Sequence, residues 1–242
     1  MTVAVILAAG VGQRMRNAGL PKQFLKLFGK PIVVYTLEKF EASKDIDKIV
    51  IVCRNGYLDY MDSLVKLYNI SKVQKIVLGG AERQNSLIRG INAAKALGSK
   101  DDDVVVIHDG VRPLVSELTI HENVRVAKEC GCAITVHSVT ESVVILSDDN
   151  IKIDNFKKRS DTYSLSAPQS FRIGLLLQAF DAGIEEHDGM PLLDAGMVFS
   201  ACGGNVQLVK ELTPNIKITT PEDFYYLKAM LELEENKFVF GL

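Results

Sequence analysis

The sequence has no excess of positive charge and no apolar run of membrane-spanning length. Its 242 residues include 28 Lys and Arg against 30 Asp and Glu, so the formal net charge is −2. Such a chain has no basic field for nucleic acid, and without an apolar stretch of about 20 residues we do not expect it to cross a membrane. Strand-like residues begin at Val3, so we expect no secretory signal and a cytoplasmic protein.

Disulfide and metal-ligand spacings are missing as well. The four cysteines form no Cys-x-x-Cys pair, and the four histidines have no metal-ligand spacing. We therefore expect reduced thiols, and we expect any required metal to arrive with substrate phosphates. The cysteines are Cys53, Cys130, Cys132 and Cys202.

Strand-like and helix-like segments alternate along the chain. This rhythm predicts an α/β fold with a parallel sheet covered on both faces, in which ligands bind at the carboxyl ends of the strands. The length allows one large α/β domain. We expect strands at Val3–Ala8, Lys48–Cys53, Lys75–Leu78 and Asp103–His108, all buried, and helices at Pro31–Ala42, Leu58–Tyr68 and Ser86–Leu97.

Between residues 135 and 160 the pattern changes to that of a two-stranded ribbon. Thr135–Leu146 is rich in residues that favour strands, Ser147–Asn150 has the composition of a turn, and Ile151–Phe156 is expected to return as a second strand. A lone ribbon is only marginally stable. It must therefore pack on its own domain or on a second subunit, and the residues leave both open.

The loop after the first strand is suited to a polyphosphate. Gly10 and Gly12 can expose backbone N–H groups to phosphate oxygens, and Arg14 and Lys22 supply positive charge. A tight strand-to-helix turn with solvated cations is the alternative. The ordered set Leu-Ala-Ala-Gly-x-Gly-x-Arg-Met followed by Pro-Lys is narrower than Gly-x-Gly alone. It fits neither a Walker loop nor a dinucleotide fingerprint.

A second glycine turn, Gly79–Ser86, follows another expected strand. Its glycines allow close backbone approach, and its polar side chains suit a base or a ribose. The alternative is an ordinary helix start capped by Asn85 or Ser86.

Charged residues also follow the strand at Asp103–His108. A carboxylate there, Asp109, is costly to bury without a cationic partner, which makes it a candidate Mg²⁺ contact, and Arg112 is a candidate phosphate ligand. An Asp–Arg pair that holds the loop together explains the same two residues. Lys217 lies in an expected short strand before a helix that begins near Pro221, and alone it would be an ordinary surface lysine.

Together these segments resemble the cytidylyltransferases that make CDP-alditols. The matching motifs stand in order from Val5 to Asp223. The resemblance implies a Rossmann-like, mostly parallel sheet with a protruding β-arm, in a single nucleotidyltransferase domain over residues 1–242. It also implies CTP with Mg²⁺ and a homodimer, in which the β-arm at residues 135–160 completes the partner's substrate pocket.

Roles follow from the resemblance motif by motif. An alditol phosphate oxygen would attack the α-phosphorus of CTP and release pyrophosphate, with Arg14, Lys22 and Lys217 neutralising charge beside Mg²⁺. Asp109 would serve the metal and the ribose. The residues implied for the alditol phosphate are Arg112, Ser142 and Arg159, and those for the nucleotide are Ala8, Ala9, Gly10, Gly12, Gly80, Arg83, Ser86 and Asp109.

Departures from the family pattern lie on the alditol side. Glu141-Ser142 stands where family arms usually carry Asp-Thr, and Asp194 lacks the usual preceding threonine. The motifs on the CTP side look more like the enzymes acting on 2-C-methyl-D-erythritol 4-phosphate, whereas the altered arm points to a polyol of the cell envelope. We expect methylerythritol phosphate as the acceptor, with ribitol 5-phosphate or a related polyol phosphate as the alternative. A second alternative is an inactive nucleotide-binding module. The presence of both Arg14 and Lys22 is evidence against it.

Overall fold

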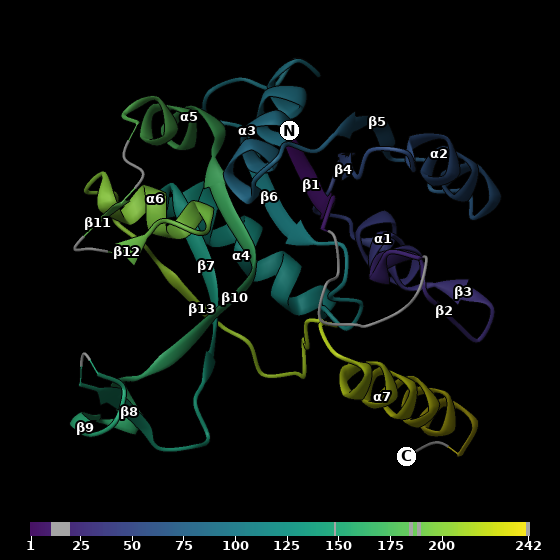
Figure 1. Cartoon of the computed structure of the whole chain (residues 1–242). Helices are drawn as coiled ribbons and strands as arrows, with labels where there is room; N and C mark the ends of the chain where they lie inside the picture. Colours follow the sequence, from purple (N-terminus) through teal and green to yellow (C-terminus); the bar gives the residue numbers. More distant parts are fainter. Residues whose placement is uncertain (11–19, 148, 184–185, 188–189, 241–242) are drawn as a thin grey trace.

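One seven-stranded sheet forms the centre of the molecule (Figure 1). The computed structural model describes residues 1–10, 20–147, 149–183, 186–187 and 190–240. Strands β6, β1, β4 and β5 are parallel, whereas β10 runs antiparallel to its neighbours β6 and β7. Across the sheet the order is β13 (Leu208–Lys210), β7 (Cys132–Ser138), β10 (Tyr163–Arg172), β6 (Val104–Asp109), β1 (Thr2–Ala8), β4 (Lys48–Cys53) and β5 (Val73–Leu78). The expected mostly parallel α/β sheet is confirmed.

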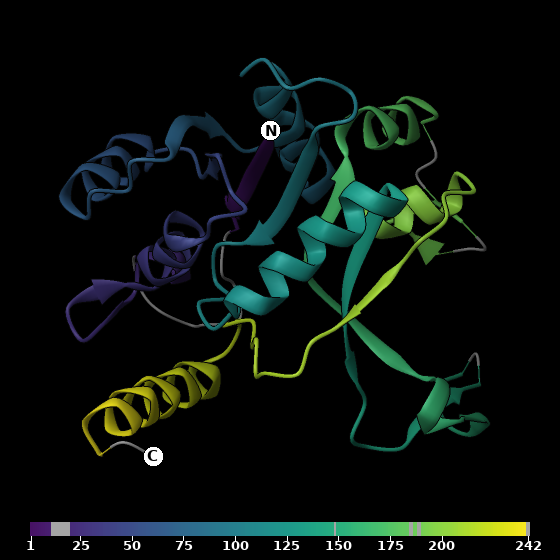
Figure 2. The same cartoon turned by 180° about the vertical axis from the view of Figure 1, so that it is seen from behind.

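Helices cover both faces of this sheet (Figure 2). Side chains of β1 alternate between two buried apolar clusters, with Ile6 on one face and Val5 on the other. The first face is covered by α1 (Ile32–Ala42), α2 (Leu58–Leu67) and α4 (Glu117–Cys130), and the second by α3 (Arg83–Lys95), α5 (Ile173–Asp181) and α6 (Ala195–Ala201). Burial on both faces explains why these strands are continuous apolar runs.

The strand order reverses beside β1. From β1 the chain builds β4 and β5 on one side and then returns to form β6 on the other. The carboxyl ends of β1 and β6 therefore meet at Ala8 and Asp109, where a sheet of this kind binds ligands.

The long helix α7 (Pro221–Phe240) lies outside these layers (Figure 1). Its Leu227 packs in a third apolar cluster with Leu27 and Ile218. Leu27 belongs to the small hairpin of β2 (Lys26–Leu27) and β3 (Lys30–Pro31), and a second small hairpin joins β11 (Glu186–His187) to β12 (Met190–Pro191). Across the described ranges, no helix is long and apolar enough to span a membrane.

A separate ribbon of β8 (Val143–Leu146) and β9 (Ile153–Lys157) protrudes from the body (Figure 1). The strand expected over Thr135–Leu146 is divided, because residues up to Ser138 belong to β7 of the central sheet. Large apolar side chains of this arm face outward, with Phe156 68% and Ile151 77% exposed.

Three further expectations about individual helices and strands are wrong. β5 is not buried but lies at the sheet edge, where half of its residues are exposed. Residues 215–218 form no strand, since their backbone bonds to other elements. Helix α3 begins at Arg83, three residues before the expected start, because Glu82 is its N-cap.

Candidate active site

A cleft of about 390 Å³ opens where β1 and β6 end. Most of the residues predicted from the sequence come together here. Those that line it are Ala8, Ala9, Gly10, Lys22, Arg83, Ser86, Asp109 and Lys217, and those that line it without having been predicted are Leu7, Gln23, Ala81, Val111 and Thr219. Gly80 stands beside the lining residue Ala81. Gly12 and Arg14 lie outside the described residues.

Two loops meet closely at this cleft. A Cβ atom on Gly79 would lie 2.4 Å from the Cβ of Ala9, so the approach requires glycine. The backbone N–H of Gly80 donates to Ser86 Oγ at 3.0 Å, which keeps the turn compact. The N-cap of α3 is Glu82, in reciprocal hydrogen bonds with Asn85, so the expectation that Asn85 or Ser86 caps this helix is wrong.

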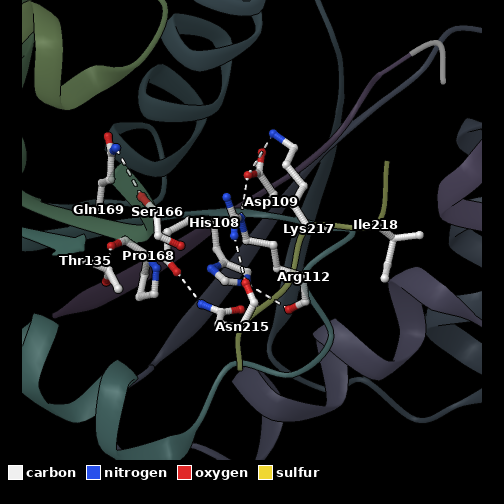
Figure 3. A network of polar contacts seen from close by, with 12 residues as sticks. His108, Asp109, Arg112, Thr135, Ser166, Pro168, Gln169, Asn215, Lys217 and Ile218 are labelled. Atoms are coloured by element: carbon white, nitrogen blue, oxygen red, sulfur yellow. Dashed lines mark hydrogen bonds and ion pairs between the residues drawn. The ribbon is translucent and has the colours of Figure 1, made fainter. Parts of the chain in front are cut away.

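Asp109 is the centre of the site and is only 5% exposed. Its Oδ1 lies 3.1 Å from Nη1 of Arg83, and its Oδ2 lies 3.1 Å from both Nε of Arg112 and Nζ of Lys217. Figure 3 shows Arg112 and Lys217 directed toward this carboxylate. The expectation that the carboxylate has a cationic partner is confirmed. The Asp–Arg pair within the loop is present too.

The ionisation of the cluster follows from this geometry. Burial raises the pKa of Asp109, but Lys217, Arg83 and Arg112 outweigh it and hold that pKa well below its usual range. Burial lowers the pKa of Lys217, and Asp109 opposes this shift. Burial also lowers the pKa of His108 to about 4, so this neighbour is neutral at pH 7. Three cations against one carboxylate leave positive charge for a phosphate.

Lys22 and Gln23 reach the site from a short 3-10 turn, η2 (Lys22–Phe24). Lys22 Nζ donates to the carbonyl of Ile218 at 2.8 Å, which places it next to Lys217 in the cleft. The Gln23 amide, 1% exposed, donates to the carbonyls of Ala8 (2.8 Å) and Gly10 (3.2 Å). Sequence reasoning gave Gln23 no role. Its place directly after Lys22 in the motif was the available signal.

A second pocket of about 280 Å³ adjoins the cleft. It shares Arg83, Asp109 and Lys217 with the cleft and adds Arg112, Gln169 and Asp194. Asp194 caps α6 by accepting from Met197 N–H at 3.0 Å. Two adjoining pockets with the cation cluster at their border can hold two phosphorylated molecules side by side.

The arm residues Ser142 and Arg159 line neither of these two pockets within one chain. Both are exposed, and Arg159 begins the 3-10 turn η3 (Arg159–Asp161) at the base of the ribbon. Its Nη1 lies 3.5 Å from the carbonyl of Thr140. The structure therefore does not bring them to Asp109.

The cleft offers one carboxylate to a metal ion. In the described part of the chain, no three His, Cys, Asp or Glu side chains are grouped to hold a metal. Mg²⁺ is commonly bound by one carboxylate together with substrate phosphates. Asp109 is the carboxylate among the residues lining the cleft that could serve in this way.

The fold and this cation cluster define a nucleotide-binding α/β enzyme that handles phosphate groups. Comparison with known proteins narrows the class. The chain belongs to the family described as IspD, 2-C-methyl-D-erythritol 4-phosphate cytidylyltransferase, whose model matches residues 2–233. It is thus a CTP-dependent nucleotidyltransferase, and the expected family is confirmed.

Individual relatives carry two different acceptor names. A ribitol-5-phosphate cytidylyltransferase of Streptococcus agalactiae serotype III (strain NEM316) is 40% identical, with all of both chains covered. A 2-C-methyl-D-erythritol 4-phosphate cytidylyltransferase of Clostridium novyi (strain NT) is 36% identical over 95% of this chain and 96% of the relative. The crystal structure of 4-diphosphocytidyl-2C-methyl-D-erythritol synthase from Anaerococcus prevotii DSM 20548 superposes with a TM-score of 0.80 at 26% identity, covering 96% of each chain.

Proposed function

We propose that this enzyme transfers a cytidylyl group from CTP to a polyol phosphate, and that ribitol 5-phosphate is the acceptor. The observation that carries the proposal is the cluster around Asp109, which sets three cations at the border of two adjoining pockets. The relative from Streptococcus agalactiae, 40% identical over both full chains, supports ribitol 5-phosphate.

2-C-Methyl-D-erythritol 4-phosphate is the second candidate acceptor. The family model over residues 2–233 and the Clostridium novyi relative support it. It is also the acceptor expected from the motifs on the CTP side. Both acceptors present a phosphate monoester and a hydroxylated carbon chain, so one chemistry serves either.

The reaction needs charge neutralisation and alignment rather than a covalent nucleophile. An oxygen of the acceptor phosphate forms a bond to the α-phosphorus of CTP while the bond to the pyrophosphate oxygen breaks. Lys22 and Lys217, which line the cleft, are proposed to stabilise the added charge together with Arg14. Arg112, which lines the second pocket only, is proposed to hold the acceptor phosphate.

We include Mg²⁺ in this proposal, bound by Asp109 and the nucleotide phosphates. When bound, the ion would neutralise phosphate charge. Phosphate oxygens would then replace the Asp109 carboxylate as partners of Arg83 and Lys217. We also propose that the enzyme works in the cytoplasm, consistent with cysteines that are all free.

The exposed arm supports a homodimer. Ile145, Ile153 and Phe156 leave apolar surface on a ribbon that is marginal alone, and a second copy of the chain would cover it. In that arrangement Arg159 and Ser142 would complete the partner's pocket for the polyol phosphate.

Initial rates of pyrophosphate release test the proposal. CTP, UTP, ATP and GTP are each supplied with ribitol 5-phosphate, 2-C-methyl-D-erythritol 4-phosphate or no acceptor. We expect release with CTP, dependent on Mg²⁺ and fastest with ribitol 5-phosphate. Faster turnover of methylerythritol phosphate would reverse the acceptor assignment. Equal rates with ATP or GTP, or full activity in EDTA, would contradict the nucleotide or the metal assignment.

A further inference from the structure

A segment without helix or strand carries Lys217 into the site. Residues 211–219, which we call the strap, connect β13 to α7. The carbonyl of Ile218 accepts from Lys22 Nζ at 2.8 Å, and that of Asn215 accepts from Arg112 Nη1 at 2.8 Å. The strap thus carries one cation of the site and binds two others, so its conformation decides where all three lie.

One end of the strap is anchored by a buried carboxylate, Glu211, which is 8% exposed. Its oxygens accept from the hydroxyls of Thr119 (2.5 Å) and Thr213 (2.9 Å) and from Nδ2 of Asn215 (2.9 Å). These three donors are uncharged. Burial of a carboxylate costs free energy that neutral hydrogen bonds only offset, so stability alone is a weak reason for an acid here.

Asn215 connects the Glu211 anchor to the site, because its side chain bonds to Glu211 and its backbone carbonyl bonds to Arg112. It is 2% exposed, and its Nδ2 also donates to the carbonyl of Ala167 in β10 at 2.6 Å. A carboxylate and a carbonyl can only accept hydrogen bonds, so Glu211 and Ala167 together fix which side of the Asn215 amide carries the NH₂ group.

The other end of the strap is fixed as well. Asp223 accepts from the backbone N–H groups of Thr219 (2.7 Å) and Thr220 (2.8 Å), and Ile218 N–H donates to the carbonyl of Val111 at 2.9 Å. Lys217 lies between the two anchors, with Nζ 3.1 Å from Asp109 Oδ2. A shift at either anchor would therefore move this ammonium group.

We propose that Glu211 and Asn215 are positioning residues, which act through the strap to set Lys217 and Arg112. Neither lines the cleft or the second pocket. The inference rests on the proposed function for the roles of the two cations. The contacts that hold them in place do not depend on that function.

Glu211→Gln is the first test, because it keeps the size of the side chain and replaces one acceptor oxygen by an NH₂ group, so that both ends can no longer accept from the present donors. We expect kcat to fall by about tenfold or more, since small misplacements of reacting groups cost up to about 100-fold. The KM for the polyol phosphate should rise as Arg112 shifts, with a smaller change for CTP. Simple loss of folded enzyme would lower kcat and leave both KM values unchanged.

The matched control is Glu41→Gln. Like Glu211, Glu41 accepts a hydrogen bond from a hydroxyl, but its other two donors are backbone N–H groups and it lies on α1, away from the strap. Its kcat and KM values should equal those of the wild type. If Glu211→Gln fails to fold, Thr119→Val removes one donor to Glu211 and leaves the strap sequence intact.

A readout without turnover separates this proposal from the proposed function. Acylation of Lys217 relative to the exposed Lys26, measured by mass spectrometry, should rise several-fold in Glu211→Gln or Thr119→Val and stay constant in Glu41→Gln. A rise in these variants, together with a wild-type protein that transfers no cytidylyl group, would support the positioning role and overturn the proposed function. Unchanged acylation and unchanged kinetic constants would overturn the positioning role.

Discussion

At the scale of residues, Asp109 gathers cations from three distant parts of the chain. Arg83 begins α3, Arg112 follows β6, and Lys217 lies before α7. The carboxylate keeps these like charges together in the free protein, and phosphate groups would compete for the same donors. The three cations are therefore already grouped beside the cleft in the free protein.

Lys22 and Arg14 provide the first prediction. If they stabilise charge on the transferring phosphoryl group, Lys22→Ala and Arg14→Ala should each lower kcat by about 10²–10³-fold, the usual cost of one preorganised donor. Steady-state kinetics measure this, with Lys26→Ala, at a nearby exposed lysine, as the control. An effect confined to KM would instead assign them to uniform substrate binding.

The cations of the site could be predicted from motifs, whereas their supports could not. Asp109 follows a buried strand, so a cationic partner could be predicted for it, and Lys22 belongs to the motif of the first glycine loop. Gln23, Glu211 and Asn215 act through hydrogen bonds to groups remote in sequence or to backbone carbonyls, as in Gln23 with Ala8. Apart from the place of Gln23 directly after Lys22, nothing in their local spacing distinguishes these residues from surface amides and acids.

At the scale of elements, burial determined which segments could be predicted. β1 and β4 lie inside the sheet, under helices on both faces, and therefore appear in the sequence as apolar runs. Their predicted bounds differ from the observed ones by no more than one residue. β5 contains a similar run, but its place at the edge is a property of strand order, which a local pattern does not contain. Residues 215–218 of the strap were predicted as a short strand, yet their backbone bonds to the Arg112 side chain and to the loop at Val111.

Glu41 provides a prediction at this scale, because it joins α1 to the turn before β5. It accepts from the N–H and hydroxyl of Ser71 and from the N–H of Lys72. Burial raises the pKa of Glu41, but these hydrogen bonds outweigh it and the pKa is lowered from 4.5. The folded state therefore binds this proton less tightly than the unfolded state. The resulting stability is present above pH 4.5 and is lost as the pH falls through the folded pKa.

Glu41→Gln should thus lower the Tm at pH 7 by about 2–4 °C, corresponding to about 1 kcal/mol. The difference from the wild type should shrink as the pH falls below 4.5, the unfolded value. Calorimetry across this range measures it, with Glu234→Gln, an exposed acid on α7, as the control. A difference that stays constant with pH would contradict the assignment.

At the scale of the whole molecule, the arm is the feature that one chain leaves unexplained. The ribbon of β8 and β9 protrudes from the body of its own chain, with Phe156 and the turn residue Ile151 exposed (Figure 1), and a two-stranded ribbon alone is only marginally stable. Composition marked this segment as a ribbon, but the residues could not decide what it packs on. That depends on a surface which the local sequence does not describe.

Mixing two inactive variants tests the arm. If Arg159 serves the partner's pocket, Arg159→Ala and Lys22→Ala should each be inactive alone and should regain activity when mixed. A heterodimer then contains one site with both residues intact, whereas each homodimer contains none. Co-purified heterodimers with two different tags give the measurement. If the purified heterodimers show no activity, Arg159 acts in its own subunit or has no role in the reaction.

The position of isotopic label in the products tests cytidylyl transfer most directly. CTP labelled at the α-phosphate and CTP labelled at the γ-phosphate are incubated separately with the enzyme, Mg²⁺ and ribitol 5-phosphate or 2-C-methyl-D-erythritol 4-phosphate. The account predicts that the α label appears in the CDP-alditol and the γ label in pyrophosphate. Transfer of the γ label to the polyol phosphate, or release of labelled pyrophosphate without any acceptor, would contradict it.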